Sequence, residues 1–411
     1  MAKERTIVII GGGAAGFFCA ANIKADSDTR IIILERSQKC LSKVKISGGG
    51  RCNVTHFSDS ISDMAKKYPR GNKLVKKTFH QFFTSDTVSW FAARGLRLKA
   101  EADNRMFPIT DDSQSVIDVL EKAVFENGVE VKLGQHVHNI LPVEDGFLLS
   151  IKGQAELHAH QLVIACGGFP KLCQFEWLQN LGHSIVSPVP SLFSFNIPRH
   201  PITELMGLSV PNAKVKVNGT KLQQSGPLLI THWGLSGPAI LKLSAYGALE
   251  LAEKEYKFQL QVNFLAEHNE DTLKEFFAVY KQQHPTQKIS NIQGFPIPKR
   301  LWDLLLFLSQ IDEEQRWLDV PAKQMNKLLK SVTALELNVT GKTTFKDEFV
   351  TAGGVSLTEI DSATLESKLQ RNLYFAGEIM DVDGITGGFN FQHAWTSGFI
   401  VGKRLSEDIE F

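Results

Sequence analysis

The chain has 411 residues, of which 43% are hydrophobic and 22% charged, the balance of a globular protein with room for two or three domains. Its formal net charge of +1 excludes a global field that would steer it toward nucleic acid or an anionic membrane. No apolar run approaches the roughly twenty residues of a membrane span. Because Met1–Arg5 leads directly into a predicted strand, without a signal peptide, we expect a cytoplasmic protein.

The five cysteines are an odd number and include no C-x-x-C pair. This pattern predicts neither a disulfide framework nor a zinc site, and we expect no bound metal. Most of them lie in apolar or glycine-rich surroundings, where a cysteine is typically a small buried hydrophobic residue. A redox-active pair is the less favoured alternative.

The first thirty-five residues carry the strongest pattern in the chain. Thr6–Ile10 has the composition of a buried parallel strand and runs directly into the glycine-rich segment 11–16, G-G-G-A-A-G. A helix is expected over 17–21, and a second buried strand over Arg30–Leu34, which ends on Glu35. This order predicts a βαβ unit that carries a G-x-G-x-x-G motif at its first turn.

Each part of this unit suits a dinucleotide. Gly11 permits the tight turn, Gly13 lets the backbone approach a pyrophosphate, and Gly16 allows the helix to pack closely on the strand. The helix N-terminus offers unpaired N–H groups and a positive dipole to the phosphates. Glu35 is placed to accept hydrogen bonds from the adenosine ribose hydroxyls, and its charge would repel a 2′-phosphate.

A second glycine-rich stretch follows at 47–53, S-G-G-G-R-C-N. Consecutive glycines beside Lys43, Lys45 and Arg51 predict a nest of backbone N–H groups that cradles an anion. The alternative is a flexible surface loop. We favour the anion-binding interpretation because the stretch directly follows the predicted nucleotide-binding strand.

The next segments predict ordinary packed structure. Residues 72–96 carry aromatic side chains on recurring faces and predict a helix, and 113–125 predicts a second helix with an apolar stripe. Residues 137–151 alternate as a small β-meander. Residues 161–168 predict a buried strand whose small tip, Ala165 to Gly167, admits close approach of a ligand.

The character of the chain changes twice in its second half. From about residue 191 short alternating segments predict antiparallel sheet, and a helical pattern follows from about residue 271. Near residue 345 the chain returns to the pattern of the nucleotide domain. We therefore predict an FAD-binding domain at 1–190 plus 345–411, a barrel-like β subdomain at 191–265 plus 335–344, and a helical subdomain at 266–334.

A nucleotide domain that opens at residue 6 and closes only near Gly377 favours FAD over NAD, because the isoalloxazine lies far from the adenine and needs contacts from late in the chain. Glu378 is placed to accept hydrogen bonds from ribityl hydroxyls. The segment 387–390, G-G-F-N, opens the last helix, whose dipole can face the flavin N1–C2 carbonyl. The alternative is a simple glycine-rich loop. Since no second G-x-G-x-x-G occurs, NAD(P)H is expected only as a transient co-substrate.

Four stretches resemble one bacterial family: the glycine-rich N-terminus, 46–55, 231–238 (T-H-W-G-L-S-G-P) and 375–390. The family is often labelled NAD(FAD)-utilising dehydrogenases and includes aminoacetone-oxidase-like and bile-acid-reductase-like flavoproteins. The resemblance implies an α/β fold, with a Rossmann-like FAD-binding domain of glutathione-reductase type interrupted by an inserted β-barrel-like subdomain and a small helical subdomain. The pattern and the resemblance together predict these cofactor-binding residues: Gly11, Gly13, Ala14, Ala15, Gly16, Glu35, Arg36, Lys45, Ser47, Gly48, Gly49, Arg51, Cys52, Asn53, Val137, Ala165, Cys166, Gly167, Gly377, Glu378, Gly388, Phe389 and Asn390.

One segment departs from the family. After Ala-x-Gly-Gly the family usually has a serine- and glycine-rich stretch, whereas this chain has Phe169–Trp177, F-P-K-L-C-Q-F-E-W. The resemblance implies that this segment lies near the flavin. A substrate preference therefore does not transfer from any member to this chain.

The sequence leaves three functions open. The favoured one is an FAD-dependent oxidoreductase that moves hydride between flavin N5 and a small or medium organic substrate, with His232 as general acid or base and Asn390 orienting the substrate. The second is a flavin-dependent RNA-modifying enzyme, for which the basic segment Lys66–Lys77 is the evidence, although a solvated helix face explains that segment more simply. The third is a non-catalytic FAD-binding redox sensor. The oligomeric state stays open.

Overall fold

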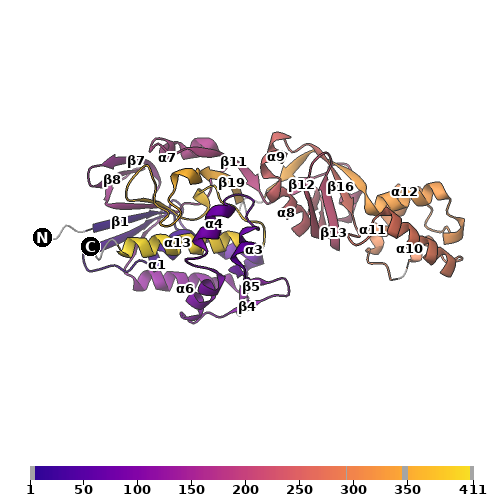
Figure 1. The fold of residues 1–411 in the computed structure, drawn as a ribbon, viewed down its shortest axis with the longest axis horizontal. Helices are drawn as coiled ribbons and strands as arrows, with labels where there is room; N and C mark the ends of the chain where they lie inside the picture. Colours follow the sequence, from indigo (N-terminus) through magenta and orange to yellow (C-terminus); the bar gives the residue numbers. More distant parts are fainter. Residues whose placement is uncertain (1–4, 293, 345–349, 408–411) are drawn as a thin grey trace. The chain divides into compact units, whose positions relative to one another are not determined.

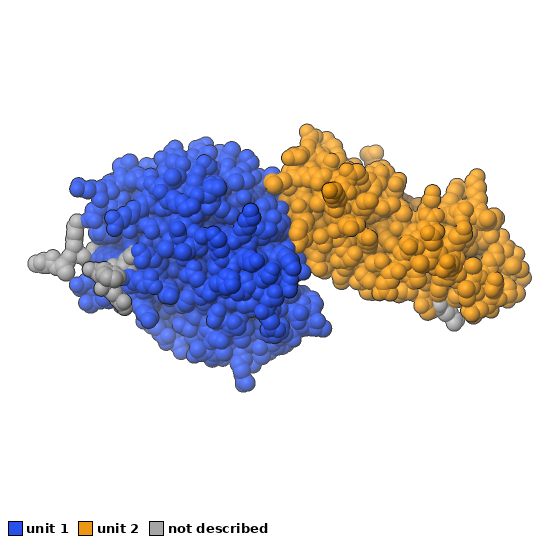
Figure 2. All heavy atoms as spheres, in the orientation of Figure 1, with its two compact units in different colours: residues 1–190, 346–411 blue, residues 191–345 orange. Residues whose placement is uncertain are grey.

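The computed structural model describes residues 5–292, 294–344 and 350–407 (Figure 1). The chain forms two compact units, residues 1–190 with 346–411 (unit 1) and residues 191–345 (unit 2) (Figure 2). Unit 1 is therefore assembled from both ends of the chain. The predicted domain boundary at residue 345 lies outside the described residues.

A five-stranded parallel sheet forms the centre of unit 1, in the order β20-β10-β1-β2-β6. The strands are β1 (Arg5–Ile10), β2 (Thr29–Leu34), β6 (Glu130–Lys132), β10 (Gln161–Ile164) and β20 (Leu373–Phe375). The last four residues of β1 and β2, and all of β10 and β20, are buried. Burial on both faces explains the continuous Ile, Val and Leu runs seen in the sequence.

The helices α1 (Ala14–Ala21) and α13 (Phe389–Glu407) pack on this sheet, and α6 (Ser113–Glu126) packs against α1 (Figure 1). Helices α1 and α13 approach closely because glycines line their contact: a Cβ on Gly398 would lie 2.7 Å from the Ala15 carbonyl oxygen, and one on Gly402 would lie 2.6 Å from that of Cys19. None of the described helices is both long and apolar enough to cross a membrane.

The remaining elements of unit 1 surround this centre. Three small sheets are present, with the strands β3 (Thr55–His56), β5 (Arg105–Pro108) and β4 (Leu98–Ala100); β7 (Val137–Val143), β8 (Gly146–Ile151) and β9 (Leu157–Ala159); and β11 (Ile185–Ser191) with β19 (Val350–Val355). The short helices are α2 (Ser42–Ile46), α3 (Ile61–Ala65), α4 (Asn72–Thr78), α5 (Thr84–Ala92) and α7 (Glu176–Gln179).

The single helix predicted over 72–96 is wrong, because the chain breaks it between α4 and α5. Phe83 is extended there, with φ −115° and ψ −171°. Its backbone N–H donates to the Asp86 carboxylate at 2.7 Å, which caps the start of α5. The break lets both Phe82 and Phe83 bury their rings, with 3% and 9% of their surface exposed.

Unit 2 contains a seven-stranded antiparallel sheet in the order β17-β16-β13-β14-β15-β12-β18. Its strands are β12 (Ser194–Asn196), β13 (Ser209–Val217), β14 (Gln223–Thr231), β15 (Gly234–Ser236), β16 (Phe258–Asn263), β17 (Leu335–Val339) and β18 (Gly341–Thr343), and its helices are α8 (Pro238–Tyr246), α9 (Ala248–Glu253), α10 (Glu270–Gln283), α11 (Lys299–Leu308) and α12 (Ala322–Thr333). One hydrophobic core runs from the strands, for example Val215 and Leu260, to the helical residues Trp302 and Trp317. The β and helical segments thus share one core.

Candidate functional site

The carboxyl ends of four neighbouring strands meet at one edge of the unit 1 sheet. β20 leads to Gly377, β10 to Ala165–Gly167, β1 to Gly11 and β2 to Glu35. In open parallel sheets this edge is where ligands bind, because loops and helix N-termini converge there. Residues from both ends of the chain are therefore brought together at one candidate site.

The first turn, after β1, is built around glycine. Gly11 has φ +117°, and a Cβ there would lie 2.4 Å from the Ala165 carbonyl oxygen. A Cβ on Gly16 would lie 2.0 Å from the Gly11 oxygen, so α1 begins tight against the turn. Gly13, the N-cap of α1, differs: its φ is −93° and a Cβ would meet no heavy atom within 4 Å. The backbone at Gly13 therefore faces open space.

Glu35 is fixed beside this turn at the end of β2. Its Oε2 accepts the Gly12 N–H at 2.7 Å and its Oε1 accepts the Ser37 N–H at 2.7 Å. Both oxygens keep lone pairs after accepting one hydrogen bond each. The carboxylate is thus oriented by the backbone and still able to accept hydrogen bonds from a diol.

The other end of the sheet edge carries a second carboxylate, Glu378. Its Oε1 accepts the Thr351 N–H at 2.8 Å, and its Oε2 pairs with the Lys43 ammonium at 2.9 Å. The predicted cofactor residue Lys45 lies elsewhere, with its ammonium 3.0 Å from Gln114 Oε1 and 3.7 Å from Asp112 Oδ1. Lys43 and Lys45 both belong to α2, and residue type alone does not tell which of them turns toward the sheet edge.

The glycine-rich stretch at 47–53 is a strained, open turn. Gly48, Gly49 and Gly50 have φ values of +59°, +69° and +86°, and a Cβ on either of the last two would meet nothing within 4 Å. Cys52 has φ +60°, and its N–H donates to the Ser47 oxygen at 2.9 Å. This geometry exposes successive backbone groups in the manner of an anion-binding nest.

Two predicted cofactor residues of this stretch make specific contacts. Arg51 pairs with Glu101 at 2.7 Å, and its guanidinium lies 4.0 Å from the centre of the Phe107 ring. With the Asn53 amide oriented so that both of its polar atoms are satisfied, its oxygen accepts the Gly388 N–H at 3.0 Å. Asn53 thereby ties the turn to the loop before α13.

The loop before α13 is closed by Asn390. Its Oδ1 accepts the Gly384 N–H at 2.7 Å and its Nδ2 donates to the Gly384 oxygen at 3.0 Å. Gly387 and Gly388 have φ values of +131° and +90°, and a Cβ on Gly388 would lie 2.6 Å from the Thr55 oxygen. Because its amide is engaged by the Gly384 backbone, Asn390 shapes the loop, and its role in orienting substrate stays a prediction.

Segment 61–78, comprising α3 and α4, anchors the same loop. Arg70 forms a buried ion pair with Asp383, which is fully buried. The Tyr68 hydroxyl donates to the Phe389 oxygen at 2.6 Å, and the Lys67 oxygen accepts the Ile385 N–H at 3.0 Å. The loop before α13 is thus held by residues about three hundred positions earlier in the chain.

Two histidines are candidates for proton transfer, and they belong to different units of the chain. His56, which the sequence reasoning missed, stacks on the Phe389 ring at 4.6 Å between centroids, with its Nδ1 3.2 Å from the Gly387 oxygen. The predicted catalytic residue His232 belongs to unit 2, where it is exposed between β14 and β15 and contacts Trp233 at 4.0 Å between centroids. His56 lies three positions after Asn53. A titratable residue so close to the S-G-G-G-R-C-N stretch was the feature of the sequence that could have pointed to His56 as a candidate.

A third histidine, His393, is buried beneath the sheet edge. Its Nε2 lies 3.3 Å from the Gly377 oxygen, its Nδ1 has no hydrogen-bond partner among the described residues, and 2% of its surface is exposed. Burial lowers the pKa of His393 to about 4. The folded protein therefore holds this ring neutral at pH 7.

Acidification should destabilise the fold through His393. An unfolded histidine takes up a proton near pH 6.5, whereas the folded ring resists protonation down to about pH 4, so stability falls as the pH drops below 6.5. Between pH 6.5 and 5 we expect a loss of about 2 kcal/mol from this residue. The free energy of unfolding of the His393→Gln variant, measured in urea at both pH values, should fall by about 2 kcal/mol less than that of the parent protein. The exposed His80→Gln serves as control, and equal losses in all three proteins would contradict the prediction.

The open edge fits FAD. Cβ atoms on Gly13, Gly49 and Gly167 would occupy space that the fold leaves free, as expected where a ligand passes close to the backbone. Glu35 offers acceptors near α1, Glu378 offers acceptors near β20, and the N-termini of α1 and α13 offer backbone N–H groups of the kind that bind anions. Val137, at the start of β7, is buried.

These features define an FAD-dependent oxidoreductase of the Rossmann type. The chain belongs to the family described as HI0933-like protein Rossmann domain, which matches residues 5–404. The predicted family and the predicted α/β fold class with a Rossmann-like FAD-binding domain are thereby confirmed.

Three relatives are similar over almost the whole chain. A 3-dehydro-bile acid delta(4,6)-reductase of Clostridium scindens is 28% identical over 98% of this chain and 99% of its own. A ribosomal RNA dihydrouridine synthase of Escherichia coli is 30% identical over 97% of both chains, and one of Haemophilus influenzae is 26% identical over 99% of this chain and 100% of its own. The crystal structure of 3-ketosteroid-delta4-(5alpha)-dehydrogenase from Rhodococcus jostii shares the fold, with TM-score 0.52 at 12% identity, covering 98% of this chain and 97% of that one.

Proposed function

We propose that the chain is a reductase of a carbon–carbon double bond conjugated to a carbonyl, with FAD as resident cofactor and NAD(P)H as electron donor. The observation that carries this proposal is the glycine-rich edge between Glu35 and Glu378, where Cβ atoms on Gly13 and Gly167 would meet no protein atom within 4 Å and two carboxylates offer hydrogen-bond acceptors. Two relatives support the bond type, since a delta(4,6)-reductase and a dihydrouridine synthase each saturate a ring double bond.

In this proposal the residues of the chain bind the cofactor and orient its parts. Gly13 and the start of α1 receive the pyrophosphate, Glu35 the ribose hydroxyls and Glu378 the ribityl hydroxyls. When bound, the flavin supplies hydride transfer at N5. His56, oriented by the Gly387 carbonyl oxygen and the Phe389 ring, is our first proposed residue for holding the accompanying proton, and His232 is the second.

One observation favours RNA as the substrate in place of a free small molecule. Lys67, Lys73 and Lys76 are exposed on segment 61–78, and none of them makes an ion pair with a described residue. The same segment holds the loop before α13 through Arg70 and Tyr68, so phosphates bound to these lysines would lie on the scaffold that carries the cofactor loop. We propose this RNA-modifying activity as the second candidate function.

The two candidates separate in one anaerobic experiment. Purified FAD-loaded protein is reduced with NADH or NADPH, and its reoxidation is followed with a 3-oxo-Δ4 steroid or with unmodified ribosomal RNA transcribed in vitro. An RNA-directed enzyme should be reoxidised by the transcript, with a rate that falls steeply with salt and drops at least about tenfold when Lys67, Lys73 and Lys76 are all changed to Glu.

The matched control changes three exposed lysines elsewhere in unit 1, Lys24, Lys122 and Lys152, to Glu. Reoxidation by the steroid alone, unaffected by either triple variant, supports the small-molecule reductase. Reduction without reoxidation by either compound contradicts both functions and supports a redox sensor. A colourless protein that does not take up FAD overturns the proposal as a whole.

A further inference from the structure

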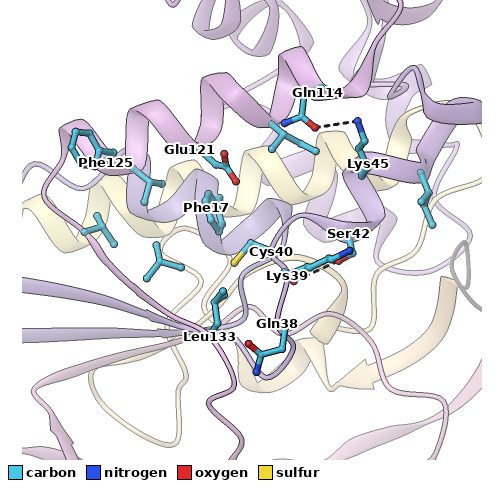
Figure 3. Close-up of a pocket in the computed structure, with 15 residues that line it drawn as sticks. Phe17, Gln38, Lys39, Cys40, Ser42, Lys45, Gln114, Glu121, Phe125 and Leu133 are labelled. Atoms are coloured by element: carbon cyan, nitrogen blue, oxygen red, sulfur yellow. Dashed lines mark hydrogen bonds between the residues drawn. The ribbon is translucent and has the colours of Figure 1, made fainter.

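Unit 1 contains a groove beside the dinucleotide edge, with a volume of about 760 Å3 (Figure 3). It lies between α1, α6, β6 and the loop that leads into α2. Of the predicted cofactor residues, Lys45 alone is among those that line it. The groove is therefore a separate hollow behind the glycine turn, and the function proposed above makes no use of it.

The floor of the groove is apolar. Phe17 of α1, Ile117 and Val124 of α6, and Val131 and Leu133 at the edge of the sheet face into it. Burial raises the pKa of the Cys40 thiol to about 12, so Cys40 adds a neutral, weakly polar surface. Val131 and Leu133 remain 39% and 41% exposed, an unusual state for neighbouring aliphatic residues at a sheet edge.

The two ends of the groove differ in character. Lys39, Ser42 and Lys45 lie at one end, and Phe125 lies at the other (Figure 3). The Lys45 ammonium is held toward Gln114, while the ammonium of Lys39 makes no hydrogen bond or ion pair with any described residue. Phe125 is 83% exposed. The groove is thus polar and cationic at one end and aromatic at the other.

We propose that this groove binds a single-chain amphiphile with a carboxylate head group, such as a medium-chain fatty acid. The head group lies between Lys39 and Lys45, and the alkyl chain crosses Phe17 toward Phe125. The volume falls within the range of small-molecule sites, and the lining combines an apolar floor with two lysines at one end that complement a carboxylate. Glu121, on the α6 wall, disfavours a second anionic group along the chain.

The test is isothermal titration of FAD-loaded full-length protein with dodecanoate below its micellar concentration. We expect saturable binding of one molecule per chain. Dodecyltrimethylammonium, with a similar chain and a cationic head group, should bind at least about tenfold more weakly, as should butyrate, which lacks the chain. Lys39→Glu and Phe125→Asp should each weaken dodecanoate binding by about tenfold, because each removes one end of the site.

Lys122→Glu is the matched control, because Lys122 lies on α6 with 73% of its side chain exposed and does not line the groove. It should bind dodecanoate like the parent protein. Flavin absorbance and circular dichroism establish that all variants are folded and loaded. The proposal is overturned if dodecanoate shows no saturable binding, if the cationic amphiphile binds equally well, or if Lys39→Glu and Phe125→Asp bind as the parent does.

Discussion

Replacing Gly13 by Ala is expected to abolish FAD retention and leave the apo-protein folded. A Cβ at this position meets no protein atom within 4 Å and the backbone, with φ −93°, accepts any residue, so the fold has no reason to change. The space that the Cβ fills is the space we assign to the pyrophosphate. We expect at least about a hundredfold weaker FAD binding, equivalent to about 3 kcal/mol.

Titration of apo-protein with FAD, followed by flavin fluorescence, measures this loss, and urea unfolding of the apo-protein measures stability. Gly341→Ala is the matched control, since a Cβ there makes an ordinary contact of 3.6 Å with Asn196 in unit 2. Gly11→Ala should instead impair folding, because its Cβ would lie 2.4 Å from the Ala165 oxygen. If Gly13→Ala binds FAD as tightly as the parent protein does, the pyrophosphate does not lie at Gly13.

Replacing Asp383 by Ala is expected to cost about 3–5 kcal/mol of unfolding free energy, because it leaves the Arg70 guanidinium buried without its carboxylate. The Asp383 side chain is fully buried and that of Arg70 is 11% exposed, so water cannot replace the missing partner. The same change releases the loop that ends at Phe389. FAD content should therefore fall together with stability in urea unfolding of the purified variant.

An exposed ion pair in the same segment provides the comparison. Lys66 and Asp63 lie 2.7 Å apart with side chains 71% and 65% exposed, and Asp63→Ala should cost less than about 1 kcal/mol. The double variant Arg70→Met with Asp383→Leu should regain part of the stability, since it removes both charges. A cost for Asp383→Ala no larger than that for Asp63→Ala would show that the buried pair does not hold the loop.

The parts of the site that sequence predicts well are those fixed by local geometry. The order strand, G-x-G-x-x-G, helix, strand, acid follows from steric needs within residues 6–35, and the structure reproduces the register of β1 against β2 that this order requires. The distant strand β20 was predictable too, because a short apolar run ending on Gly377 has few other uses in an α/β chain.

The parts that escaped prediction depend on contacts distant in sequence. Asn390 closes a loop with Gly384, and His56 stacks on Phe389, a pairing that joins residues over three hundred positions apart. Lys43 and Lys45 are equivalent in composition and differ only in which side of α2 each occupies. The break at Phe83 coincides with the burial of two adjacent aromatic rings, a tertiary contact that the local pattern does not reveal.

The discontinuity of unit 1 has a consequence for biosynthesis. The strand β20 and the helix α13 are translated after unit 2, yet β10 pairs with β20 and α1 packs on α13. The growing polypeptide therefore emerges from the ribosome with β10 lacking its neighbour β20 and α1 lacking α13, and unit 2 can complete its own core before these partners are made. Nascent chains should accordingly depend on chaperones until β20 and α13 have been translated. A stop codon before β20 should yield insoluble protein.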